Sequence, residues 1–221
     1  MPSALILGAS RGLGLGLARE FAGRGWTVSG TVRKEADRAA LEGAGVRALL
    51  CDITDAAAVA ALHEQVPAGL DLLFVNAGIS GPGHQDAAQA TAQEAGMLFL
   101  TNAIAPVQAA RALMDRLAPD GVLAFMTSRM GSVKDNNRGD MELYRASKAA
   151  LNSMTRSLAA KLDQPRTVLS LHPGWVQTDM GGPGADLDVA TSVRGLADVI
   201  VAARGKPGSR FLDYSGAELP W

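Results

Sequence analysis

Short apolar runs alternate with longer amphipathic segments along this chain, and that alternation constrains the fold more than any other feature. The apolar runs predict strands at Ala4–Leu7, Thr27–Val32, Val46–Leu50, Leu70–Val75, Val122–Met126, Val168–Leu171 and, with a weaker pattern, Arg210–Leu212. The segments between them are rich in Ala, Leu, Arg and Glu, which favour helices. They predict helices at about 13–24, 35–43, 55–65, 90–117, 142–162 and 187–204.

Apolar strands that alternate with helices are typical of a parallel sheet covered on both faces. Because crossovers between parallel strands are right-handed, the order predicts an α/β, doubly wound (Rossmann) sheet of about seven strands. No linker or repeat interrupts the 221 residues, so a single domain over 1–221 is expected. Thr54, Asp55 and Asp186 stand where helix N-caps are expected.

The composition excludes several classes of protein. The 22 acidic and 21 basic side chains leave a formal charge of -1, with no basic surface for nucleic acid. No apolar run approaches the roughly 20 residues of a membrane span, and the first residues lack a secretion signal. Cys51 is the single cysteine, and the three histidines are too scattered for a metal site. We therefore expect a cytoplasmic enzyme, or a binding protein on the same frame.

A glycine-rich segment, Gly8-Ala-Ser-Arg-Gly-Leu-Gly14, follows the first expected strand and opens the first helix. Its glycines permit a tight turn and close approach of the backbone to a pyrophosphate, and the helix N-terminus offers N–H donors to that anion. The segment therefore predicts a dinucleotide site. Its expected cofactor-binding residues are Gly8, Ser10, Arg11, Gly12, Leu13 and Gly14.

The end of the second strand indicates which dinucleotide binds. NAD enzymes usually carry an acidic side chain there, which accepts the ribose hydroxyls. This chain instead has Arg33, which can pair with a 2′-phosphate in bidentate fashion, and Arg11 can reach the same phosphate from the other side. NADP(H) is therefore the expected cofactor. Two alternatives stay open: Arg33 and Lys34 are solvated charges, or the chain uses NADH.

Two further strand ends face the same edge of the sheet. Asp52, followed by Ile53, is expected either to accept a hydrogen bond from the adenine amino group or to cap a helix, and capping is preferred for Asp55. At the next strand end, Asn76 is expected to brace neighbouring strands, and the small residues that follow allow close approach to the adenosine ribose. A simple turn is the alternative here. This segment is Asn76, Ala77 and Gly78.

Tyr144-Arg-Ala-Ser-Lys148 carries the most specific chemical signal. Residues four apart share a helix face, so the phenol and the ammonium can act on the same bound group. We expect the Lys148 cation to lower the pKa of Tyr144, which would then exchange a proton with a carbonyl or alcohol oxygen. Tyr214 has no such partner and is expected to pack.

A serine at the end of the fifth strand completes the candidate set. Ser128 is expected to hold the substrate oxygen near the phenol. Ser132 competes for this role, and a serine that bonds only its own turn is the alternative.

Together these motifs resemble the short-chain dehydrogenase/reductase family. The resemblance covers nearly the whole chain, with the motifs in family order: the glycine loop at 8–14, NAG at 76–78, Asn102, Ser128, YRASK at 144–148 and HPGWVQTDM at 172–180. It implies that the catalytic residues are Asn102, Ser128, Tyr144 and Lys148. In that set Asn102 holds a water in a proton relay and Lys148 also binds the nicotinamide ribose. The resemblance also places Pro173, Gly174, Val176 and Thr178 at the cofactor, the last two at the nicotinamide carboxamide.

The chain departs from the family pattern at two points. Leu7 stands where the glycine motif often begins with Thr, and the loop between Ser128 and Tyr144 is longer than is common. Residues 211–221 and 128–132 resemble the C-factor-like and carbonyl-reductase-like branch. The implied function is NADPH-dependent reduction of a carbonyl compound, with a signalling protein of little or no turnover as the alternative. A homodimer or homotetramer through the helices at 90–117 and 142–162 is also implied.

The substrate pocket is expected among the segments that follow the carboxyl ends of strands, at about 79–86, 130–141 and 175–188. The apolar side chains of these segments include Met130, Met141, Trp175 and Met180. No cluster of Arg or Lys marks a phosphate or coenzyme A handle, so a small apolar or aromatic ketone or aldehyde is the expected substrate.

Overall fold

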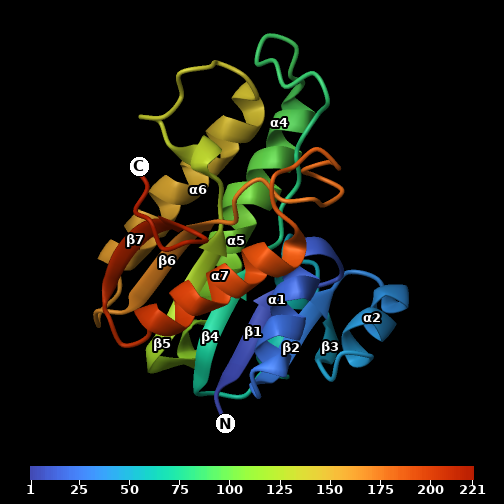
Figure 1. Cartoon of the computed structure of the whole chain (residues 1–221), viewed down its shortest axis with the longest axis vertical. Coiled ribbons are helices and arrows are strands. Elements are labelled where there is room, and N and C mark those ends of the chain that lie inside the picture. The colour runs from blue at the N-terminus through green and yellow to red at the C-terminus, as the bar shows by residue number, and fades with distance from the viewer.

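A parallel sheet of seven strands forms the centre of the computed structural model, which describes all 221 residues (Figure 1). The strands are β1 (Ser3–Leu7), β2 (Thr27–Val32), β3 (Arg47–Leu50), β4 (Leu70–Val75), β5 (Leu117–Met126), β6 (Thr167–His172) and β7 (Gly208–Asp213). Their order in the sheet is β3-β2-β1-β4-β5-β6-β7. The order reverses between β1 and β4, so the chain leaves a crevice at their carboxyl ends, where ligands bind in such sheets. The predicted doubly wound α/β fold is confirmed.

Helices cover both faces of this sheet (Figure 1). They are α1 (Gly12–Gly23), α2 (Arg38–Glu42), α3 (Ala56–His63), α4 (Ala92–Phe99), α5 (Ala105–Ala112), α6 (Glu142–Ala160) and α7 (Val189–Ala203). The single helix expected at 90–117 is divided, because a π-helical turn at Leu100–Ile104 joins α4 to α5. Pro106 has no N–H to donate to the carbonyl four residues earlier, so regular α-helical bonding cannot run through this point. No helix is both long enough and apolar enough to cross a membrane.

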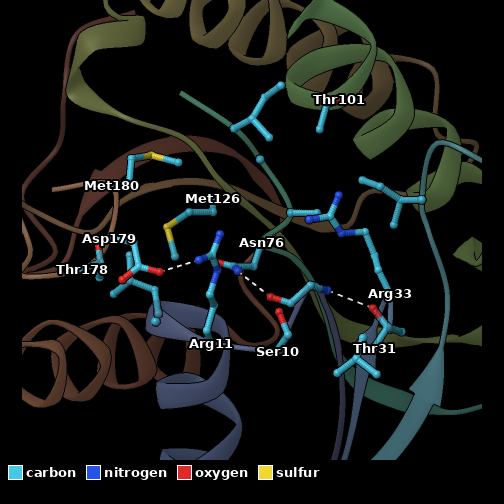
Figure 2. A pocket seen from close by; sticks show the side chains of 18 of the residues that line it. Ser10, Arg11, Thr31, Arg33, Asn76, Thr101, Met126, Thr178, Asp179 and Met180 are labelled. Atoms are coloured by element: carbon cyan, nitrogen blue, oxygen red, sulfur yellow. Dashed lines mark hydrogen bonds and ion pairs between the residues drawn. The ribbon is translucent and has the colours of Figure 1, made fainter. Parts of the chain in front are cut away.

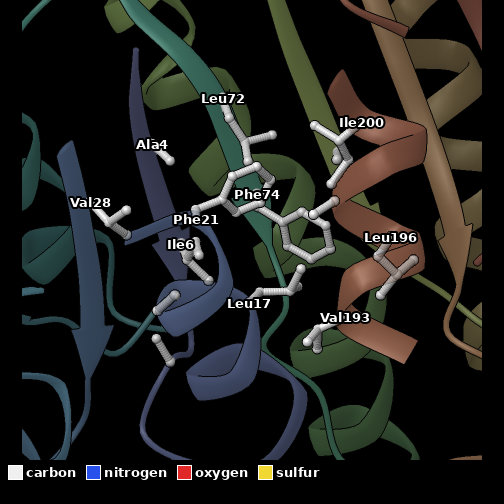
Figure 3. Close-up of a cluster of buried hydrophobic side chains, with 14 of the residues drawn as sticks. Ala4, Ile6, Leu17, Phe21, Val28, Leu72, Phe74, Val193, Leu196 and Ile200 are labelled. Carbon is white, nitrogen blue, oxygen red and sulfur yellow. The ribbon is translucent and has the colours of Figure 1, made fainter. Parts of the chain in front are cut away.

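The strands divide their side chains between two hydrophobic cores. On β1, Ala4 and Ile6 face the core that contains Phe21 of α1 and Leu196 of α7 (Figure 3). Leu5 and Leu7, which alternate with them, face the second core under α3, α5 and α6. Full burial of such a side chain contributes about 1.5–3 kcal/mol, so both faces of the sheet resist displacement of the strand ends that carry the site.

The N-cap of α3 is the predicted residue, whereas the N-cap of α7 lies two residues after the predicted one. Asp55 caps α3 as predicted, with its Oδ1 accepting from Ala57 N at 2.8 Å. The expectation for Asp186 is wrong, because α7 is capped by Asp188, whose Oδ1 accepts from Thr191 N at 2.6 Å. The chain is still extended at Leu187, which bridges to Val176, so the helix can begin only after that contact.

Candidate active site

A cavity of about 720 Å³ opens at the carboxyl ends of the strands, where the strand order reverses (Figure 2). Most residues expected at the cofactor line it: Gly8, Ser10, Arg11, Gly12, Leu13, Arg33, Asp52, Ile53, Asn76, Ala77, Gly78, Tyr144, Lys148, Pro173 and Thr178. The expected residues that do not reach its surface are Gly14, Asn102, Ser128, Gly174 and Val176. One cavity therefore joins the glycine loop to the Tyr144–Lys148 pair.

The glycine loop is held in place by its neighbours. Asn76 Nδ2 donates to Gly8 O at 2.7 Å, which is the predicted brace between strand ends, and Gly8 N donates to Thr31 Oγ1 at 2.9 Å (Figure 2). A Cβ at Gly14 would overlap the Gly8 carbonyl and lie 2.6 Å from Asn76 Nδ2. Gly14 thus lets α1 pack against the loop, although it does not face the cavity. Sequence reasoning missed Thr31, whose place at the end of β2 was the available signal.

The two arginines expected at one phosphate point in different directions. The Arg11 guanidinium forms an exposed ion pair with Asp179, which follows Thr178 on the opposite wall of the cavity (Figure 2). Arg33 is exposed at the cavity surface and forms no ion pair. In this structure Arg33 is therefore the available cation at the end of β2, while Arg11 is already neutralised by a carboxylate. The Asp179 partner was not foreseen.

Asp52 is engaged by its own turn. Its Oδ1 accepts from Thr54 N at 2.9 Å and from Thr54 Oγ1 at 2.7 Å. Partial burial opposes ionisation, but the Thr54 hydrogen bonds and the charge of Arg33 outweigh it and lower the pKa of Asp52. The carboxylate is thus charged and lies at the cavity beside Arg33.

Tyr144 and Lys148 line the other end of the cavity, and Ser128 lies near the phenol without reaching the cavity surface. The Ser128 side chain lies close enough to the Tyr144 phenol to oppose the rise of the phenol's pKa. Ser128 Oγ also accepts from Met130 N at 3.1 Å, so bonding to its own turn leaves the hydroxyl proton free for another acceptor. Lys148 Nζ lies 5.8 Å from the centre of the Tyr144 ring and donates to Met126 O at 3.0 Å. The predicted shared helix face brings these groups into one site.

The pKa of Tyr144 moves in the direction opposite to the one predicted. Burial raises it to about 12, and the Ser128 contact only partly opposes this. Burial also lowers the pKa of Lys148 to about 8, so the same surroundings make the charged form of this side chain less favourable. The expectation that Lys148 acidifies the phenol is wrong for this structure, because desolvation dominates and the ammonium is directed to the Met126 carbonyl.

Asn102 lies in the π-helical turn and is completely buried. Its Oδ1 accepts from Ile79 N at 2.8 Å, and its Nδ2 donates to Ile79 O at 2.8 Å and to Ser147 Oγ at 3.0 Å. The side chain therefore clamps the segment after β4, next to Gly78, to the helix that carries Tyr144.

The structure separates the two candidate serines. Ser132 Oγ accepts from Asp135 N at 3.1 Å and lies 3.5 Å from the carbonyl oxygen of Trp221, and neither serine lines the cavity. Tyr214 packs against the core beside α7, as expected. Ser128 is the serine beside the phenol.

The apolar part of the cavity differs from the expected one. Of the side chains proposed for it, only Met180 lines the cavity, and Trp175 instead donates from Nε1 to Gly181 O at 2.9 Å and closes its own loop. The other lining residues at this end are Ile79, Met97, Thr101, Met126 and Thr127. Met97 and Thr101 lie on α4 and the π-helical turn, which sequence reasoning did not connect to the pocket.

A family model described as short chain dehydrogenase matches residues 2–186. The chain belongs to the short-chain dehydrogenase family. A relative, C-signal from Myxococcus xanthus, is 43% identical over 161 residues, which cover 69% of this chain and 93% of C-signal. The resemblance to the C-factor-like and carbonyl-reductase-like branch is confirmed by this relative and by the structures below.

Solved structures of short-chain dehydrogenases superpose on the whole chain. A short-chain dehydrogenase/reductase from Burkholderia multivorans with bound NADP has a TM-score of 0.95 at 39% identity, covering 100% of this chain and 99% of the other. A carbonyl reductase from Pseudomonas aeruginosa PAO1 in complex with NADP has a TM-score of 0.92 at 43% identity, covering 100% of both chains. The solved structures therefore share the family and the overall fold of this chain.

Proposed function

We propose that this chain is an NADPH-dependent carbonyl reductase for small apolar or aromatic ketones and aldehydes. The observation that carries the proposal is that Tyr144 and Lys148 line the same cavity as the glycine loop, with Ser128 close to the phenol. The NADP-bound carbonyl reductase from Pseudomonas aeruginosa supports the reaction class and the cofactor.

The residues present fit the proposed cofactor. The cavity volume of about 720 Å³ lies within the range of ligand pockets. Gly8 has φ 85°, and a Cβ there would lie 2.9 Å from Ala77 N, so only glycine lets the loop lie this close to the end of β4. A glycine loop of this kind at a helix N-terminus is suited to a pyrophosphate. Arg33, an exposed cation without an ion pair, is suited to a 2′-phosphate. The same proposal assigns Asp52 to the adenine side and Thr178, which also lines the cavity, to the nicotinamide carboxamide.

The proton in this proposal comes from Tyr144. Bound NADPH supplies a hydride to the substrate carbonyl carbon. A phenol whose pKa is raised to about 12 remains protonated at neutral pH, which suits a proton donor to the substrate oxygen. Ser128 donates its free hydroxyl proton to the same oxygen and orients it. Lys148 holds the nicotinamide ribose, and Asn102 fixes the Ile79 backbone and a water of the proton relay.

Substitution of each of the two tyrosines by Phe tests the catalytic assignment. We expect Tyr144→Phe to lower kcat for NADPH oxidation with a ketone and aldehyde panel by about 10²–10⁴-fold, the usual contribution of a general acid. Tyr214→Phe is the matched control, because it removes the only other phenol hydroxyl, which lies outside the cavity lining. A Tyr144→Phe enzyme as fast as wild type refutes the assignment, and a panel in which only acyl-thioesters react refutes the substrate class.

Two substitutions of neighbouring basic residues test the cofactor assignment. Arg33→Ala is expected to weaken NADPH binding by about 10–100-fold, the contribution of a hydrogen-bonded charge, and to leave NADH binding unchanged. Lys34→Ala is the matched control, since Lys34 is also exposed but does not line the cavity. The assignment fails if Arg33→Ala leaves the dissociation constant for NADPH unchanged.

The similarity to C-signal supports a second candidate, a dinucleotide-binding signalling protein with little or no turnover. It predicts tight binding of NADPH by calorimetry and no carbonyl reduction above the Tyr144→Phe background. A cytoplasmic location and a homodimer or homotetramer through α4, α5 and α6 are also proposed, and sedimentation of the purified chain tests the latter.

A further inference from the structure

The helix that carries Tyr144 begins without a cap from its own neighbourhood. Met141, at the N-cap position of α6, is left-handed with φ 54° and ψ 40°, and its side chain makes no capping hydrogen bond. The first N–H groups of a helix have no intrahelical partner and need an acceptor from elsewhere. Tyr144 is the third residue of α6, and its N–H donates to Oε1 of Gln85 at 3.0 Å. The cap comes from a residue 59 positions earlier.

Gln85 is fixed at both ends of its amide. Its Nε2 donates to Ser80 O at 2.8 Å and to Pro82 O at 2.7 Å, within the segment that follows Ile79. Its own backbone is left-handed, with φ 55°, a conformation that is costly for a side chain of this kind. Such strain persists where the surroundings determine the conformation, and here three side-chain hydrogen bonds do so.

A second hydrogen bond runs in the reverse direction. Glu142, the first residue of α6, accepts from Ala87 N through Oε2 at 2.9 Å. Gln85 and Glu142 thus satisfy one backbone N–H on each other's segment, which is the reciprocal pattern of a capping box formed here between distant parts of the chain. The 80–87 segment and the start of α6 are held together by side chains that do not line the cavity.

We propose that Gln85 is a positioning residue for carbonyl reduction, because its side-chain oxygen caps α6 at the Tyr144 amide and so sets the place of the phenol. Gln85 touches neither the cavity surface nor the phenol, and it acts through the Tyr144 backbone. The inference rests on the proposed reductase function for its catalytic consequence. The cap itself is independent of turnover.

Hydrogen exchange tests the cap in the full chain. Gln85→Leu keeps the size of the side chain and removes the acceptor, so exchange of the Tyr144 amide is expected to accelerate about fivefold to thirtyfold, the effect of losing a helix cap. Gln89→Leu is the matched control, because Gln89 lies just beyond this segment and its side chain bonds only Asp86. Unchanged exchange of the Tyr144 amide in Gln85→Leu refutes the cap.

Kinetics separate positioning of the phenol from general stability. Gln85→Leu is expected to lower kcat for the carbonyl about tenfold, as for displacement of a catalytic group, with KM for NADPH unchanged. Gln85→Glu keeps an acceptor for the Tyr144 N–H and loses the donor to Ser80 and Pro82, so it is expected to restore most of kcat. A Gln85→Glu enzyme as slow as Gln85→Leu shows that loop anchoring matters instead, and overturns the proposal.

The two proposals fail in different ways. If the wild-type chain reduces no carbonyl, the proposed function fails and the exchange rate of the Tyr144 amide decides the cap. If wild type and Gln85→Leu reduce the carbonyl equally well while Tyr144→Phe does not, the reductase stands and Gln85 has no positioning role.

Discussion

Replacing Lys148 with Met is expected to stabilise the fold while abolishing the proposed carbonyl reduction. Lys148 is only 3% exposed, forms no ion pair, and places its Nζ 3.0 Å from the Met126 carbonyl oxygen. Burial lowers its pKa from 10.5 to about 8, which means that the folded protein holds the proton less tightly than the unfolded chain does. A buried ammonium with one hydrogen-bond acceptor is retained here at a cost in stability.

The pKa difference sets the magnitude. A fall from 10.5 to about 8 corresponds to about 3 kcal/mol of destabilisation when the amine is charged in both states. Loss of the hydrogen bond to Met126 removes about 1 kcal/mol. Lys148→Met is therefore expected to raise the free energy of unfolding at pH 7 by about 2 kcal/mol, or Tm by about 4–8 °C for a chain of this length.

The lowered pKa of Lys148 also predicts how the stability of the wild type changes with pH. Below pH 8 the amine is protonated in both states, and the folded wild type carries the full penalty. Between about pH 8 and 10.5 the unfolded chain binds more protons than the folded one, so wild-type stability rises with pH. The advantage of the Met variant should therefore shrink across this interval.

Urea unfolding followed by circular dichroism at pH 7 and at pH 10 measures both quantities. Lys161→Met is the matched control, because Lys161 is exposed at the end of the same helix and should give no pH-dependent difference. A Lys148→Met protein that is less stable than wild type at pH 7, or a stability difference that does not change with pH, refutes the reasoning.

Three further predictions concern residues in or next to the cavity. Gly14→Ala should destabilise the fold by about 1–3 kcal/mol and weaken NADPH binding, because its Cβ would meet the Gly8 carbonyl; a stable, tightly binding variant in calorimetry contradicts this. Asp179→Asn should change stability by less than about 1 kcal/mol, since the ion pair with Arg11 is exposed, and should tighten NADPH binding at low salt by freeing Arg11; weaker binding contradicts it. Burial, with the charges of Asp52 and Asp55, raises the pKa of Cys51 to about 11, so alkylation near neutral pH should be about a hundredfold slower than for free cysteine, and fast labelling of the native chain contradicts it.

Local sequence patterns were sufficient for the frame of the site. The alternation of apolar and amphipathic segments predicted the seven parallel strands, because strand and helix periodicities are set within a few residues. The glycines at 8–14 and the four-residue spacing of Tyr144 and Lys148 predicted two parts of one cavity for the same reason. The predicted role of Asn76 as a link between neighbouring strand ends is confirmed, since the carboxyl ends of neighbouring parallel strands meet at one edge of the sheet.

Only the tertiary structure decided the pKa values of these groups and the long-range contacts that hold them in place. The pKa of Tyr144 rises because packing removes water from the phenol, and no spacing of residues encodes that desolvation. Ser128 lies near the phenol, whereas the Ser132 hydroxyl lies 3.5 Å from the Trp221 carbonyl oxygen. The Arg11–Asp179 ion pair and the Gln85 cap join residues 168 and 59 positions apart. Contacts between such distant segments exist only once the sheet and helices have assembled, so the sequence alone leaves them open.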